Sequence, residues 1–129
     1  MDSLTISFHK KSEELPRLEL FLEAVSLGRD WQLILWGGKK HIGALVLAEP
    51  GQPARFLSCP GHREAPISCE LAELCAKELN CNIAFCCGIH YDNITKAEIE
   101  EVLLLARSLV RDFLADIART RVQSIDTSR

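Results

Sequence analysis

The sequence predicts an α+β domain: a mostly antiparallel six-stranded sheet, a β-meander, with two helices, of which the C-terminal one is long. Five apolar or alternating runs separated by turn residues precede residue 59, a pattern typical of consecutive hairpins. The period then becomes helical over 66–79 and 96–120, with one more apolar run between them. Strands followed by helices are typical of α+β domains. With 129 residues and 47% hydrophobic content, the chain is expected to form a single domain, 1–129.

Each predicted strand has the alternation or the apolar content that a sheet requires. Residues 4–9 alternate apolar and polar, as in a half-buried strand, and a polar connector follows up to residue 16. Residues 18–27 fit a strand or a helix, but the turn residues and the β-type run that follow favour a strand. Residues 37–40 are predicted to form a hairpin turn. The remaining strands are predicted at 31–36, 42–48, 55–58 and 82–87.

The helices are predicted from their apolar spacing and from the residues at their ends. Pro66 suits the first turn of a helix, where its missing N–H costs nothing, and Asn80 suits the C-terminal cap. Thr95 and Glu98 have the spacing of a capping box at the start of the long helix. The tail at 122–129 is expected to be frayed.

The two strands at 31–36 and 42–48 are apolar on both faces. If both helices cover one face of such a sheet, the other face must be covered by a second subunit. The alternative is that one helix covers each face. Exposed apolar sheets of this size mark interfaces. We therefore expect a homodimer or a stable protein partner.

Composition excludes several classes of function. The net charge is −3, and the basic pairs Lys39-Lys40 and His62-Arg63 are local, which argues against nucleic acid as a partner. No apolar run reaches the ~18 residues of a membrane helix, so no membrane association is expected. The N-terminus lacks the features of a signal peptide, which predicts a cytoplasmic protein. None of the six cysteines forms a C-x-x-C pair, and buried reduced thiols are the expected state.

Three loops that each carry a histidine supply the candidate site. They read Gly37-Gly38-Lys39-Lys40-His41, Cys59-Pro60-Gly61-His62-Arg63 and Gly88-Ile89-His90-Tyr91-Asp92-Asn93. Glycine permits positive φ and close approach of the backbone to a ligand, while imidazole, lysine and arginine supply donors and charge. If these loops meet in space, they form a small polar basin for an anion or a metal.

The chemistry of this basin stays open at the level of sequence. A phosphate would be met by the cationic side chains, by backbone N–H groups of the glycines and by the start of the last helix. A metal would be held by His41, His62 and His90, with Asp92 as a fourth ligand. The alternative is that these residues bind nothing. Lys39 and Lys40 would then be the solvated tip of a hairpin, and the histidines would form hydrogen bonds within the protein. Pairing of Cys59 with His62, or of Cys87 with His90, has no recognisable local signature, so no catalytic residue is predicted.

The loops also carry a family resemblance. Gly-Gly-Lys-Lys-His-Ile-Gly-Ala at 37–44, Pro-Gly-His-Arg-Glu at 60–64 and Gly-Ile-His-Tyr-Asp-Asn-Ile-Thr at 88–95 resemble segments of the small D-subunit family of gallate decarboxylase, described as prenylated-flavin chaperone-like. The resemblance covers roughly residues 30–117, and the N-terminal thirty residues match nothing that we recognise. It implies a non-catalytic accessory protein that binds or delivers prenylated flavin mononucleotide, or FMN, to a large decarboxylase subunit.

On this resemblance, the candidate cofactor-binding residues lie in the three loops, and Trp36 beside the glycine turn offers a surface for stacking on the flavin ring. Core or interface packing is the alternative role of Trp36. The candidate cofactor-binding residues are Gly37, Gly38, Lys40, His41, Gly43, Gly61, His62, Arg63, His90 and Asn93.

The element order has a second resemblance, to the small dimeric proteasome-assembly chaperones. It implies a fold and dimerisation but no site chemistry. Two alternative functions therefore remain beside the flavin-related one. The first alternative is a homodimeric assembly or scaffold protein without a ligand. The second is a metal-dependent enzyme that uses the histidines.

Overall fold

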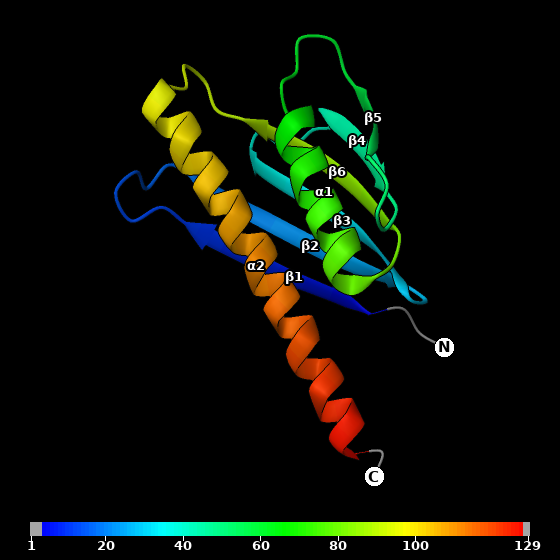
Figure 1. Cartoon of the computed structure of the whole chain (residues 1–129). Coiled ribbons are helices and arrows are strands. Elements are labelled where there is room, and N and C mark those ends of the chain that lie inside the picture. Colours follow the sequence, from blue (N-terminus) through cyan, green and yellow to red (C-terminus); the bar gives the residue numbers. More distant parts are fainter. Residues whose placement is uncertain (1–3, 128–129) are drawn as a thin grey trace.

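The computed structural model describes the backbone of residues 4–127 and the side chains of residues 4–121. Within these residues the chain forms one six-stranded sheet and two helices (Figure 1). The elements follow the predicted order and lie close to the predicted bounds. They are β1 (Thr5–Lys11), β2 (Glu19–Leu27), β3 (Asp30–Gly38), β4 (Ala44–Ala48), β5 (Arg55–Ser58), α1 (Ala65–Leu79), β6 (Ile83–His90) and α2 (Lys96–Thr127).

The strand order in space is β1-β2-β3-β6-β4-β5. β6 lies between β3 and β4 and runs parallel to β3, whereas all other neighbouring strands are antiparallel. The prediction of a mostly antiparallel six-stranded sheet with two helices is thus confirmed, but the continuous meander is wrong after β3. β3 and β4 do not pair, because the chain leaves one strand position empty after β3 and forms β4 and β5 beyond it. α1 then carries the chain back, and β6 fills the position between β3 and β4.

The predicted hairpin turn at 37–40 is wrong for the same reason. Gly37 and Gly38 are the last residues of β3 and pair with Ile89 and His90 of β6. The Lys39 N–H extends this ladder by donating to the His90 carbonyl at 3.0 Å. The following residues form an irregular connection to β4 rather than a tight turn.

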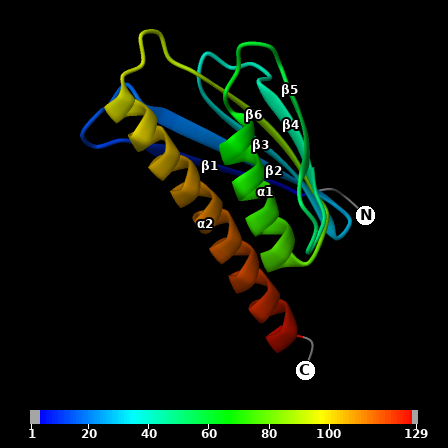
Figure 2. The same cartoon turned by 45° about the horizontal axis from the view of Figure 1, so that its top comes forward.

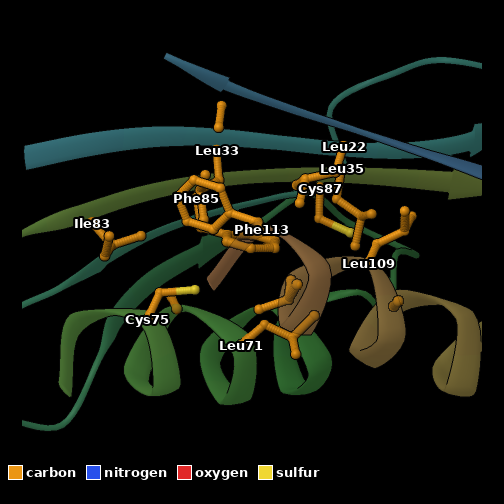
Figure 3. Packing of buried hydrophobic residues seen from close by; sticks show 14 of the residues in the cluster. Leu22, Leu33, Leu35, Leu71, Cys75, Ile83, Phe85, Cys87, Leu109 and Phe113 are labelled. Carbon is orange, nitrogen blue, oxygen red and sulfur yellow. The ribbon is translucent and has the colours of Figure 1, made fainter. Parts of the chain in front are cut away.

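Both helices lie on the same face of the sheet (Figures 1 and 2). α1 packs on β4 and β6, α2 packs on β1 and β2, and the two helices contact each other. The alternate residues of β2, β3, β4 and β6 that face the helices form the core, and Ile6 and Phe8 of β1 pack against it (Figure 3). Phe113 of α2 is fully buried and contacts Trp31 edge to face, with ring centroids 5.2 Å apart.

The other face of the sheet is left uncovered by this chain. The apolar side chains of Leu45, Leu47 and Leu57 are 46%, 41% and 74% exposed there. On the same face, Trp36 stacks on Phe21 with ring centroids 5.4 Å apart. The arrangement with one helix on each side is therefore wrong, and an apolar sheet face remains open to a partner or a ligand.

The helix ends follow the predicted capping. Asn80 has a left-handed φ of 50° after α1, and Pro66 lies in the first turn of that helix. The capping box of α2 is confirmed: the Thr95 N–H donates to Glu98 Oε1 at 3.0 Å, and the Glu98 N–H donates to Thr95 Oγ1 at 3.1 Å. α2 continues to Thr127, beyond its predicted end. The side chains of the predicted frayed tail, 122–129, lie outside the described residues. Neither helix in the described range has the length and apolar content needed to cross a membrane.

Candidate functional site

The three histidine-bearing loops meet at one end of the sheet and are joined by backbone hydrogen bonds. The Gly43 N–H donates to the Cys87 carbonyl at 2.8 Å, and the Cys59 N–H donates to the Gly43 carbonyl at 2.9 Å. The bond between Lys39 and His90 described above links the first loop to the third. The imidazoles consequently gather: the ring centroid of His41 lies 4.9 Å from that of His62 and 6.3 Å from that of His90.

Glu64 occupies the centre of this cluster. Its buried carboxylate accepts the N–H of Arg63 at 3.0 Å through Oε1 and the N–H of Ile89 at 3.3 Å through Oε2. Oε2 also lies 3.0 Å from His41 Nε2. Gly43 borders the carboxylate so closely that a Cβ at that position would come within 2.1 Å of Oε2. The glycine is thus explained by packing against Glu64 rather than by an exposed turn.

The sequence did not single out Glu64 as a site residue. An acidic residue before an amphipathic helix is ordinary, because it lies near the positive end of the helix dipole. The available signal was its place beside His62 and Arg63, at the end of a segment already singled out. What could not be foreseen is that β6 brings the Ile89 N–H to its carboxylate.

His41, His62 and Glu64 form a group that could hold a metal, with one ligand atom of each lying within 4.8 Å of the others. His90 and Asp92, which the sequence placed in the metal set, lie outside this group. They contact each other instead, with 3.1 Å between His90 Nε2 and Asp92 Oδ1, at an exposed position.

The structure does not bring all the glycines and cations of the predicted phosphate basin to one place. Gly37 and Gly38 are held in the strand ladder, and the Nζ of Lys40 lies 4.0 Å from the centroid of the Trp36 ring, on the open face of the sheet. Gly61 has a φ of +78° in an exposed turn. Among the described residues, Lys39 and Arg63 are exposed cations that form no ion pair. Asn93, with a left-handed φ of 53°, shapes the loop that leads to α2.

The start of α2, which the sequence offered as a further anion site, is already occupied by an internal carboxylate. Arg17 donates to Glu98 through Nε at 2.6 Å and through a second nitrogen at 2.9 Å. The hydrogen bond from Arg17 and those from Thr95 lower the pKa of Glu98 to about 2. The positive end of this helix dipole therefore faces Glu98.

Cys87 does not act as a nucleophile paired with His90. Cys87 faces the core, and burial raises the pKa of its thiol to about 12, which keeps it protonated (Figure 3). This contradicts the interpretation of Cys87 and His90 as a nucleophile and its base. Cys86 points to the opposite face, as expected of adjacent strand residues. All six cysteines are free, and Cys59 is the exposed one.

A groove of about 460 Å³ lies on the open face of the sheet, over β4, β5 and β6. Its lining is mainly apolar and includes Leu45, Leu47, Leu57 and Cys86. Gly88 lies two residues beyond Cys86 on the same face of β6, and the backbone of His41 packs against it. The end of the groove at Cys86 is thus roughly 7 Å along the strand from the point where the His41 backbone crosses β6.

Comparison with known proteins identifies the family. A family model described as "Prenylated flavin chaperone LpdD-like domain" matches residues 14–118. The chain belongs to this family. The match contains all three loops, and it begins before β2, so the family resemblance extends further toward the N-terminus than the sequence motifs alone indicated.

Solved structures support the fold. Nine chains match, and one of them belongs to a structure described as "Crystal Structure of a Novel Chaperone Complex for Yeast 20S Proteasome Assembly". This chain and the yeast chain are 13% identical, the alignment covers 93% of this chain and 98% of that one, and the TM-score is 0.60. The likeness confirms the predicted similarity of fold to proteasome-assembly chaperones. No curated protein matches the sequence.

Proposed function

We propose that this chain is a non-catalytic accessory protein that binds prenylated FMN, or FMN, and supports its delivery to a large decarboxylase subunit. Membership of the LpdD-like family supports a chaperone role. The observation that carries the proposal is the apolar groove on the open sheet face, whose strand β6 continues from Cys86 to Gly88, where the loop that carries His41 packs against it. The prenylated flavin would supply the chemistry of decarboxylation once it is bound in the partner enzyme. This chain would bind the flavin before that transfer.

The two parts of the site suit the two parts of a flavin nucleotide. The groove volume of about 460 Å³ is within the range of roughly 300–1,000 Å³ typical of small-molecule sites. Its leucines would contact the ring system and the prenyl group, and the indole of Trp36 offers a stacking surface on the same face. The phosphate would reach the cations at the other end. Because Glu64 already accepts the nearby backbone N–H groups, the exposed side chains of Lys39 and Arg63 are the donors available to the phosphate.

The test is a pair of titrations that differ only in the phosphate group. The double variant Lys39→Ala with Arg63→Ala should weaken FMN binding by about 10–100-fold, because charge-assisted bonds to phosphate are strong. Binding of riboflavin, which lacks the phosphate, should change little. The matched control is Lys77→Ala, which removes an exposed cation from the last turn of α1. Unchanged FMN affinity in the double variant would remove this assignment of the phosphate.

A second candidate function is a homodimeric assembly or scaffold protein that uses the same face without a ligand. The exposed side chains of Leu45, Leu47 and Leu57 favour it, because contiguous apolar surface is unusual on a monomer. Light scattering should then report a dimer, and Leu57→Asp should yield a monomer. The control is Leu104→Asp, which alters a leucine that is 60% exposed on α2. If FMN shifts the dimer toward monomer, the flavin and the second copy use the same groove.

We also propose a cytoplasmic location. Its support is that all six cysteines are free, which suits a reducing compartment. Fractionation of the source cells would test this.

A further inference from the structure

We infer that His41, His62 and Glu64 form a binding site for a divalent transition-metal ion of the zinc class. Two imidazole nitrogens and one carboxylate oxygen would be the ligands, and the fourth position would be open to solvent or to an exogenous anion. Sites with three protein ligands of this kind and one open position are a recurrent zinc arrangement. The inference does not depend on flavin binding.

The distances are close to those of a bound site. One ligand atom of each residue lies within 4.8 Å of the others, whereas ligand atoms around tetrahedral zinc are about 3.3 Å apart. The widest pair must therefore approach by about 1.5 Å. His62 can supply this movement, because its side chain is exposed and its loop turns at Gly61. Glu64 and His41 are already within 3.0 Å of each other.

The hydrogen bonds around the two histidines orient the correct nitrogens. His41 Nδ1 lies 2.8 Å from the Lys39 carbonyl, and His62 Nδ1 lies 3.0 Å from the Pro60 carbonyl. In each case a backbone oxygen two residues earlier accepts the Nδ1 proton, so Nε2 is the nitrogen left to bind an ion. Histidines that ligate metals characteristically donate their second N–H to a carbonyl or carboxylate. Two histidines of one cluster share this arrangement here.

Burial and hydrogen bonds fix the position of the Glu64 carboxylate. Glu64 is buried, and its Oε1 accepts the Arg63 N–H, which leaves Oε2 directed at His41. His41 Nε2 lies 3.0 Å from Oε2. A metal ion would be bound by both atoms and would replace this contact. Two neutral imidazoles and one carboxylate leave a divalent ion with one net positive charge, which favours an anionic fourth ligand.

His90 provides the matched control because it is a neighbour that lacks these features. Its ring centroid is 6.3 Å from that of His41, and its Nε2 contacts the exposed Asp92 rather than Glu64. If the histidines contributed only a general affinity for zinc, removing His90 would weaken binding as much as removing His62. If the ligands are His41, His62 and Glu64, removing His90 should leave the zinc affinity unchanged.

The experiment is calorimetric titration of untagged protein with Zn²⁺ alone. We expect one ion per chain, an affinity lowered at least about tenfold in His62→Ala, and no change in His90→Ala. Cys59→Ser should also bind normally, and the Co²⁺ form should show tetrahedral visible absorption without a thiolate charge-transfer band. His62 is exposed, so its variant should keep the fold, which a thermal melt verifies. Equal losses in His62→Ala and His90→Ala, loss in Cys59→Ser, or absence of stoichiometric binding would overturn the inference.

Discussion

The backbone of His41 lies directly against Gly88, so closely that a Cβ at residue 88 would come within 1.7 Å of the His41 carbonyl oxygen. The loop before β4 therefore crosses β6 at the one position on that face where the strand has no side chain. This contact sets the height of His41 above the sheet and brings its ring to Glu64. The glycine of the third loop thus acts on the candidate site through packing.

Replacing Gly88 with alanine should consequently displace the loop that carries His41. We expect destabilisation of about 1–3 kcal/mol, typical of overpacking, together with weaker Zn²⁺ binding. Urea unfolding and the calorimetric titration described above measure the two effects. Gly51→Ala is the control, since a Cβ there would meet nothing within 4 Å. It should cost only about 1 kcal/mol, for its positive φ, and leave zinc affinity intact. A Gly88→Ala protein with normal zinc affinity would contradict this role.

Glu98 should make the stability of the protein depend on pH in acid. Its pKa is lowered to about 2 in the folded chain by the hydrogen bond from Arg17, whereas its ordinary value is 4.5. The unfolded chain therefore takes up this proton first as the pH falls. The stabilising contribution is complete above about pH 4.5 and declines as the pH falls toward about 2.

Unfolding by urea at about pH 6 and about pH 3 tests this dependence. The Glu98→Gln variant should be less stable than the wild type at the higher pH, and the difference should shrink at the lower pH. Glu100→Gln, at an exposed position on the same helix, should follow the wild type at both values. A gap that stays constant with pH would show that the ion pair with Arg17 does not contribute through this carboxylate.

The secondary structure of this chain could be predicted from sequence because its signals are local. Alternation and turn residues mark the strands, and the Thr95–Glu98 spacing marks the start of α2. The strand order could not be predicted, because β3 and β4 are both apolar and nothing local indicates that β6 separates them. The hairpin at 37–40 was a wrong prediction for that reason.

The candidate site could be predicted only as three loops. Their histidines do come together, but Glu64 at the centre was missed because its partners, His41 and Ile89, arrive from distant parts of the chain. The loop glycines were interpreted as allowing positive φ and close approach of the backbone to a ligand. At positions 43 and 88 they are required by close packing instead, which depends on the tertiary arrangement.

Truncation of Phe113 should test the core that joins the long helix to the sheet. Its fully buried ring meets Trp31 and Phe8 edge to face, with centroids 5.2 and 6.3 Å away. Phe113→Ala should therefore cost about 3–5 kcal/mol of unfolding free energy. Leu104→Ala, on the exposed side of the same helix, should cost about 0.5 kcal/mol or less. Similar losses in both variants would show that α2 does not dock on the sheet through this face.

The thiols should separate into reactive and protected classes. Cys59 is exposed, whereas burial raises the pKa of both Cys75 and Cys87 to about 12. At neutral pH roughly one thiol in 10⁵ is ionised at such a pKa, and the thiolate is the nucleophile. Cys75 and Cys87 should therefore react with an aromatic disulfide reagent only as fast as the protein opens.

Stopped-flow labelling of the native protein should accordingly show one fast thiol per chain. The fast phase should disappear in Cys59→Ser and persist in Cys75→Ser, and urea should release all six thiols to the reagent. Cys86 is partly buried on the open sheet face, where burial raises the pKa of its thiol. Its slower labelling should become slower still when FMN fills the groove, because Cys86 lines it. Labelling of Cys86 that is indifferent to FMN would place the flavin elsewhere on the protein.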